Sequence, residues 1–246
     1  NMSKKIIIID NSNLSYSGSD IDGTFLRGTE TSLILLSEQF FKMGYKIDYC
    51  NEIKEERIIN GVKYFNKKKI DKKIIYDLAI AISDANQFSH VTSLKKAIFS
   101  VSNQPLEKFI RKKQLIPFFK FKPTVVTLCN YQYNKRSFFT SFYGKKTIPI
   151  TIDPKFLSTK IDLDYLPKKQ VVYNIRSNRN LDRLIKIWIE KIYPINHEFK
   201  LFITPDLIEY SDYLKDNNIF LRKIGSRQEM IDELSHYRAL TYMGHK

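Results

Sequence analysis

Residues 5–9, a lysine followed by four isoleucines, form the most restrictive stretch of the chain. An unbroken β-branched run of this kind is typical of a strand that is buried on both faces of a parallel sheet. Further strand-like and helical stretches alternate along most of the sequence. Alternation of this kind predicts right-handed crossovers that cover both faces of a parallel sheet. We therefore expect an α/β fold.

The first half of the chain is expected to form a complete sheet with its covering helices. A hairpin is predicted at 57–65, because Asn60-Gly61 is a strong two-residue turn signal. The helix at 29–43 should end at Met43-Gly44, where glycine can take the left-handed conformation. The other expected strands are 5–9, 45–50, 76–82, 97–102, 124–129 and 147–151, and the other expected helices are a short one near 89–96, 105–115 and 131–142.

The pattern lapses at about 152–168, in a stretch with Pro154 and Pro167, and then starts again. The pattern predicts two α/β units: a first unit at 1–153, a linker at 154–168, and a smaller second unit at 169–246. The second domain has about four strands, which is short for a doubly wound sheet. Its expected strands are 170–175, 199–203, 219–224 and 239–243, and its expected helices are 181–193, 206–216 and 227–237.

The net charge of +15 points to anionic partners without choosing among them. Nucleic acid, an anionic membrane face and phosphorylated substrates would all be attracted. A lysine-, isoleucine- and asparagine-rich composition from an AT-rich genome accounts for the charge equally well. The sequence has no RNA-binding fingerprint and no basic recognition helix, so nucleic acid is disfavoured.

Two cysteines and no run of about 20 apolar residues indicate a reducing compartment and no membrane span. We expect a cytoplasmic protein, with peripheral contact at the inner membrane face as an additional option. The aromatic and basic stretch 106–121 fits such a contact, but core packing of its phenylalanines is the stronger interpretation.

Three stretches should lie at the carboxyl ends of strands, where open parallel sheets bind ligands. The first is the long loop 10–28, which enters a helix at Arg27-Gly28-Thr29. A strand, a glycine turn and a helix can present backbone N–H groups to an anion, although Gly28 could equally serve only the turn. The second is 100–105, with Asn103. The third is 174–180, where Arg176 and Arg179 suit a diphosphate or cap a helix in solvent.

Several other site types are not expected. The four histidines are scattered and no metal-ligand spacing occurs, so we expect no metal site. The Walker A pattern, the dinucleotide-binding glycine pattern after the first strand and the hydrolase nucleophile elbow are absent.

In this order the motifs resemble the GT-B glycosyltransferases of the glycosyl transferases group 1 kind. RGTE followed by LLSEQFFKMGYKIDYC is similar to the family's glycine loop and first helix, with Arg27 in place of the first glycine. SVSNQP resembles the strand end V-H-N-P, with Ser102 where histidine is common and Asn103 retained. NIRSNRNLDRL resembles the donor-phosphate motif, and FLRKIGSRQEM resembles the segment beside the nucleotide base.

The resemblance implies a GT-B fold of two Rossmann-like domains with parallel sheets, an acceptor-side domain at 1–153 and a nucleotide-sugar-binding domain at 169–246. The second domain would be incomplete, because the family's glutamate-bearing donor loop should follow Met243. It implies a hexosyl-type transferase that moves a sugar from a nucleoside-diphosphate sugar to an acceptor with retention, without a cofactor or metal. The acceptor (a glycan, a lipid-linked molecule or a small molecule) and the catalytic residue stay unknown. A truncated or degenerate module that binds a nucleotide or a partner without catalysis is the alternative. The donor-binding residues implied are Arg27, Gly28, Thr29, Asn103, Arg176, Arg179, Asn180, Ile224, Gly225 and Arg227.

Overall fold

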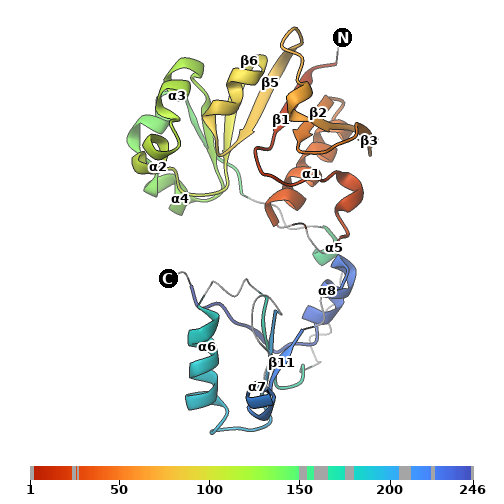
Figure 1. Cartoon of the computed structure of the whole chain (residues 1–246), viewed down its shortest axis with the longest axis vertical. Coiled ribbons are helices and arrows are strands. Elements are labelled where there is room, and N and C mark those ends of the chain that lie inside the picture. The colour runs from red at the N-terminus through yellow and green to blue at the C-terminus, as the bar shows by residue number, and fades with distance from the viewer. Residues whose placement is uncertain are drawn as a thin grey trace. The chain divides into compact units, whose positions relative to one another are not determined.

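The structure is a computed structural model of the 246-residue chain, shown in Figure 1. It describes residues 3–23, 26, 28–149, 154–157, 166–174, 180–204, 212–222 and 225–244. The chain divides into two compact units. Unit 1 comprises residues 1–21 and 25–153, and unit 2 comprises residues 22–24 and 154–246.

Unit 1 is built on an eight-stranded sheet with the order β3-β4-β2-β1-β5-β6-β7-β8. All of its described pairings are parallel except the hairpin between β3 and β4. The strand order reverses at β1, because β2 lies on one side of it and β5 on the other. The strands are β1 (Lys5–Ile9), β2 (Lys46–Asn51), β3 (Arg57–Ile59), β4 (Val62–Asn66), β5 (Ile75–Ile82), β6 (Thr92–Ser100), β7 (Thr124–Thr127) and β8 (Lys145–Thr147).

Helices cover both faces of this sheet, as the isoleucine run of β1 requires. Ile6 and Ile8 pack in the cluster that includes Leu33 of α1, whereas Ile7 and Ile9 pack in the opposite cluster with Phe118 of α3. The helices of unit 1 are η1 (Gly18–Asp20), α1 (Gly28–Lys42), η2 (Lys67–Lys69), η3 (Ala85–His90), α2 (Leu106–Arg111), α3 (Leu115–Phe121), α4 (Asn130–Lys135) and η4 (Phe138–Ser141).

Two glycine turns of unit 1 are as predicted. Gly44 has φ +91° and ends α1, and the Tyr45 amide donates to the Phe40 carbonyl at 3.1 Å, which satisfies the helix end. Asn60 and Gly61 both have positive φ, as the tight turn between β3 and β4 demands.

The helix expected near 89–96 is wrong. The 3₁₀ helix η3 ends at His90, and β6 begins at Thr92, where pairing with Ile75 of β5 draws the chain into the sheet. The helix expected at 105–115 is two helices instead. Lys113 takes a left-handed φ of +53° between them, because the buried Gln114 side chain accepts a hydrogen bond from the Ala85 amide at 3.1 Å. The helix expected at 131–142 is also divided, into α4 and η4, and the backbone is extended at Arg136 and Ser137 between them.

Unit 2 has a four-stranded parallel sheet with the order β11-β10-β9-β12, and this order reverses at β9. Part of the expected linker is α5, which contacts α8 within unit 2. The strands are β9 (Gln170–Tyr173), β10 (Lys200–Ile203), β11 (Ile219–Leu221) and β12 (Ala239–Leu240). The helices are α5 (Pro154–Leu157), α6 (Leu181–Ile187) with its π-helical continuation η5 (Trp188–Ile192), α7 (Asp212–Asp216) and α8 (Arg227–Leu234).

Trp188 lies in the middle of the core of unit 2. Its ring is 1% exposed and packs in one cluster with Leu184 of α6, Leu214 of α7 and Leu201 of β10. The other face of the sheet carries Phe202, whose ring lies 5.3 Å from that of Tyr237 just beyond α8. None of the described helices is long and apolar enough to cross a bilayer.

Candidate functional site

The strand order of unit 1 reverses between β1 and β5, and we call this point the crossover reversal. Open α/β sheets bind ligands in a crevice at the carboxyl ends of the strands on either side of such a point. Asp10 directly follows β1, and Asp84 follows β5. The side-chain amide of Asn11 donates a hydrogen bond to the Asp84 carboxylate, so the two loops are joined across the reversal.

Asp10 is the centre of a buried hydrogen-bond network. Its carboxylate accepts from the Ser12 amide at 2.9 Å, from the Ser12 hydroxyl at 2.8 Å and from the Tyr16 hydroxyl at 2.6 Å. The Tyr16 hydroxyl also lies 2.5 Å from that of Tyr49. Burial, and then the charge of Asp10, raises the pKa of Tyr16, so this phenol stays a neutral donor. With three donors in place, Asp10 fixes the loop after β1.

Glu30 lies near the start of α1, where a carboxylate is favoured by the helix dipole. It is 5% exposed, and its Oε2 atom has no hydrogen-bond partner among the described residues. A buried acceptor of this kind calls for a donor. A hydroxyl group of a ligand would supply one.

A third polar loop follows β6. The Lys108 ammonium donates to the Ser102 hydroxyl at 2.7 Å and lies 3.4 Å from the Asn103 carbonyl. Burial, and then the neighbouring Lys112 and Arg111, lowers the pKa of Lys108. Gln104 donates to Ser100 and leaves its own buried Oε1 without a partner in the described structure. Lys108 therefore places a partly buried cation beside position 102.

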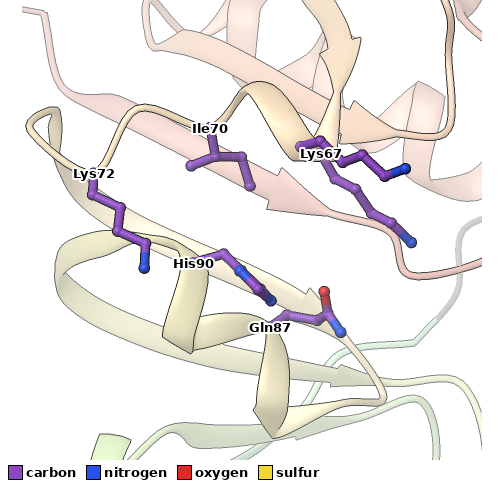
Figure 2. A pocket seen from close by; sticks show the side chains of 6 residues that line it. Lys67, Ile70, Lys72, Gln87 and His90 are labelled. Carbon is purple, nitrogen blue, oxygen red and sulfur yellow. The ribbon is translucent and has the colours of Figure 1, made fainter.

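Two pockets adjoin these loops. One, of about 260 Å³, lies beside the loops after β1 and β2 and is lined by Tyr16, Asp20, Lys54 and Arg57 among others. The other, of about 440 Å³, is lined by Lys67, Lys68, Ile70, Lys72, Gln87 and His90. Figure 2 shows Lys67, Ile70 and Lys72 on one side of this lysine pocket and Gln87 and His90 on the other.

The lysine pocket is connected to the crossover reversal through Gln87, which donates to the Asp84 carboxylate at 2.8 Å. Lys67 is neutralised by Glu52, whose carboxylate lies 2.6 Å away. Lys68 and Lys72 are exposed, and within the described residues neither has an ion-pair partner. The pocket therefore suits a phosphate or carboxylate group.

In unit 2, the carboxyl ends of the strands carry an arginine network. Arg222, 6% exposed after β11, donates two hydrogen bonds to the Glu233 carboxylate, at 3.1 and 2.6 Å, and a third to Asn174. Burial alone would raise the pKa of Glu233, but the hydrogen bonds from Arg222 and Tyr237 lower it. Arg222 is fully used in joining β11, β9 and α8, so it is not a free cation for a ligand.

The structure places the predicted site residues on the carboxyl sides of the two sheets, as far as it describes them. Gly28 and Thr29 open α1, and Asn103 is exposed after β6. Within the described part of unit 1, no hydrogen bond joins them. Asn180 is 8% exposed with φ +62° and donates to the Met243 and Gly244 carbonyls at 3.3 and 3.5 Å. Arg27, Arg176, Arg179 and Ile224 lie outside the described residues.

Gly28 does not need to be glycine for the fold. Its φ is not positive, and an added Cβ would meet no described atom within 4 Å.

Gly225 and Arg227 have packing roles beside the start of α8. A Cβ on Gly225 would come within 2.2 Å of the Glu229 carboxylate, which caps α8 together with Ser226. Arg227 is 9% exposed, and burial lowers its pKa while the charge of Asp22 opposes the shift. Their expected contact with a nucleotide stays a prediction.

Asp10, Glu30, Lys108 and Arg222 were not singled out from the sequence as site residues. Asp10 had a signal as the first charge after a buried strand, and Glu30 and Arg222 lie within the stretches RGTE and FLRKIGSRQEM. No group of three or more His, Cys, Asp or Glu residues in the described structure could share a metal ion.

The chain resembles solved glycosyltransferase structures over almost its whole length. A glycosyltransferase from Rickettsia africae ESF-5 matches 99% of this chain and 74% of its own, with a TM-score of 0.62 and 10% identity. The lipopolysaccharide outer core galactosyltransferase WaaB matches 98% of this chain and 74% of its own, with a TM-score of 0.54 and 12% identity. TarM matches 75% of this chain and 41% of its own, with a TM-score of 0.50 and 15% identity.

No protein-family model matches the chain, and no curated protein matches it in sequence. At 10–15% identity, the structural likeness establishes the fold. The chain therefore has the α/β architecture of GT-B type, with a parallel sheet in each of two units.

Proposed function

We propose that this protein transfers a sugar from a nucleoside-diphosphate sugar to an acceptor, with retention of anomeric configuration and without a metal ion. The observation that carries the proposal is the match of 99% of the chain to a glycosyltransferase structure. Polar side chains at the carboxyl ends of both parallel sheets support it, because ligands of open α/β sheets bind there.

The reaction needs positive charge where the leaving diphosphate develops its negative charge. Preorganised arginines and backbone N–H groups can supply that stabilisation. Arg176 and Arg179 are our candidates, because they lie in sequence between Asn174, which follows β9, and Asn180, which precedes α6. Gly28, Thr29 and Asn103 are the candidates from unit 1, with Arg27, Ile224, Gly225 and Arg227 as further donor contacts.

The acceptor would bind to unit 1, at the lysine pocket and near Glu30. The lysine pocket supports an acceptor with a phosphate or carboxylate group, since Lys68 and Lys72 offer charge there. The unpartnered Oε2 atom of Glu30 supports a hydroxyl-bearing ligand nearby.

The test is a donor screen with the full chain. Calorimetric titration with UDP, GDP and ADP identifies the base, and nucleotide release from the matching sugar donors measures turnover, with and without EDTA. NMR of the sugar product, recorded before mutarotation, reports its anomeric configuration. Nucleotide binding with turnover that survives EDTA is the expected result.

Nucleotide binding without turnover on any donor would favour the alternative, a module that binds without catalysis. Failure to bind any nucleoside diphosphate at millimolar concentration would contradict the proposed transferase and leave only a module that binds a partner.

A further inference from the structure

Unit 1 exposes four large apolar side chains on neighbouring elements. Ile116 and Phe119 of α3 are 81% and 41% exposed, and Phe138 and Phe142, in and just after η4, are 79% and 58% exposed. The Phe142 ring centroid lies 5.6 Å from that of Phe138 and 6.4 Å from that of Phe119, so the rings form one surface. We call these four residues the aromatic patch.

The aromatic patch is built on a packed base. Phe118 and Phe139 are buried, with 0% and 5% of their surface exposed. The residue next to each of them in the sequence, Phe119 or Phe138, is exposed. The buried Phe139 contacts both Phe119 and Phe138, with centroids 5.9 and 6.2 Å apart. Phe138 and Phe142 are more than half exposed, so packing of unit 1 does not explain them. Contiguous exposed apolar surface of this kind marks an interaction site.

The same segment carries a large excess of positive charge. Residues 106–146 contain ten lysines and arginines and one acidic residue, Glu107, so their net charge is +9 of the +15 of the whole chain. Lys112 and Lys113 lie in the turn before α3, and Lys120 is next to Phe119. Within the described structure, no ion pair joins any of these ten cations to a carboxylate. Figure 1 shows α2, α3 and α4, which carry four of these ten cations, gathered on one side of unit 1.

We propose that the aromatic patch and the lysines around it dock this protein on the surface of an anionic lipid bilayer. An anionic bilayer offers negative charge with an apolar layer directly beneath it, and both features are matched here. The cations would meet the headgroups, while the phenylalanine rings enter the boundary with the acyl chains. This inference does not depend on the donor or on sugar transfer.

Two other partners fit the surface less well. A second copy of this chain would bring two surfaces of charge +9 together in an isologous dimer, and their repulsion opposes it. Single-stranded nucleic acid needs open ring faces for stacking. The ring pairs of Phe138 with Phe139 and with Phe142 are edge-to-face, so each ring covers part of its neighbour.

Flotation of the full chain with vesicles tests the proposal. Vesicles of phosphatidylcholine alone should bind weakly, and vesicles that also contain phosphatidylglycerol should bind well. Phe138→Ser with Phe142→Ser should weaken binding to the anionic vesicles by about tenfold or more. Lys112→Gln with Lys113→Gln and Lys120→Gln should weaken it by roughly a hundredfold, since each lysine near the surface contributes about tenfold or less.

Matched control variants separate the patch from general surface properties. Met43→Ser with Ile58→Ser removes two apolar side chains of 69% and 70% exposure elsewhere on unit 1. Lys4→Gln with Lys42→Gln and Lys46→Gln removes the same charge from another surface of unit 1. Both controls should bind anionic vesicles within about twofold of the unaltered protein. Circular dichroism confirms that each variant is folded.

Three results would overturn the proposal. One is equal loss of vesicle binding in the control variants. Another is absent vesicle binding together with a concentration-dependent dimer that the phenylalanine variant abolishes, which would assign the surface to a second copy. The third is tighter binding to a single-stranded oligonucleotide than to vesicles, lost in the same patch variants.

Discussion

Gly28 shows how a residue can lack a structural reason for its identity. It is the first residue of α1, and the space where a Cβ would lie is open among the described atoms. Alanine is favoured over glycine in a helix, so Gly28→Ala should leave the free energy of unfolding unchanged or raise it by up to about 1 kcal/mol. If the glycine serves the donor, calorimetry should show weaker nucleotide-sugar binding in this stable variant.

Gly44→Ala is the matched control for Gly28→Ala. Gly44 has φ +91°, so alanine there is strained and should lower stability by about 1–3 kcal/mol without changing donor affinity in the folded protein. Unchanged donor affinity in Gly28→Ala would show that this glycine is not a donor contact.

Arg176 and Arg179 carry the donor-phosphate assignment. Loss of both charge-assisted contacts should weaken UDP or GDP binding by about 1.5–3 kcal/mol for each arginine. The double variant Arg176→Ala with Arg179→Ala should therefore show no measurable nucleotide binding in calorimetry, with a nearly unchanged Tm. Arg183→Ala, which removes an exposed arginine of α6, serves as the control. A double variant that binds nucleotide like the unaltered protein would rule the assignment out.

At the scale of elements, the Arg222–Glu233 pair joins the end of β11 to α8. Glu233→Gln removes the charge that holds a buried guanidinium and should cost about 1–3 kcal/mol of stability at neutral pH. Because the folded pKa of Glu233 is lowered, its contribution is present above the usual value of 4.5 and is lost as pH falls through the folded value. The variant and the unaltered protein should therefore converge in acid.

Urea unfolding followed by the fluorescence of Trp188 measures this effect at each pH, because Trp188 is the only tryptophan of the chain and lies in unit 2. Glu190→Gln is the control, since its pair with Lys186 is exposed and 3.9 Å long. A stability difference that persists unchanged in acid would contradict the linkage.

The elements that could be predicted from sequence are those whose signals are local. The isoleucines of β1 and the turn at Asn60-Gly61 dictate their structures within a few residues. The division of the helix expected at 105–115 depends on Gln114 reaching the loop after β5, a contact between residues about thirty positions apart. β6 begins early because β5 is already there to pair with it. Tertiary partners of this kind leave no periodic signal.

In the candidate site, too, features with a local signal could be predicted and features that depend on tertiary contacts could not. Its place, at the carboxyl ends of strands, follows from the alternation of elements and was predictable. Its cations were not. Lys108 reaches Ser102 only because α2 turns back along the end of β6, and Arg222 meets Glu233 only because α8 packs beside β11. Neither pair has a fixed spacing that a motif could record.

At the scale of the whole molecule, the two units have separate cores. The described part of unit 1 has two buried clusters, one on each face of its larger sheet, whereas that of unit 2 has the single cluster around Trp188. Unit 2 should therefore unfold at the lower urea concentration. We expect two transitions, with Trp188 fluorescence following the first and far-ultraviolet circular dichroism following both. Coincident transitions by the two probes would show instead that the units unfold as one cooperative body.

Urea unfolding in the presence of a nucleotide shows which unit binds it. A ligand that binds only the folded form of one unit stabilises that unit, by about 2.7 kcal/mol at a concentration of 100 times its Kd. If the diphosphate is held by the segment between β9 and α6, UDP or GDP should move the Trp188 transition to higher urea and leave the second transition in place. In the double variant Arg176→Ala with Arg179→Ala, this shift should vanish. A nucleotide that moves only the second transition would place the diphosphate site in unit 1 and refute the assignment to these arginines.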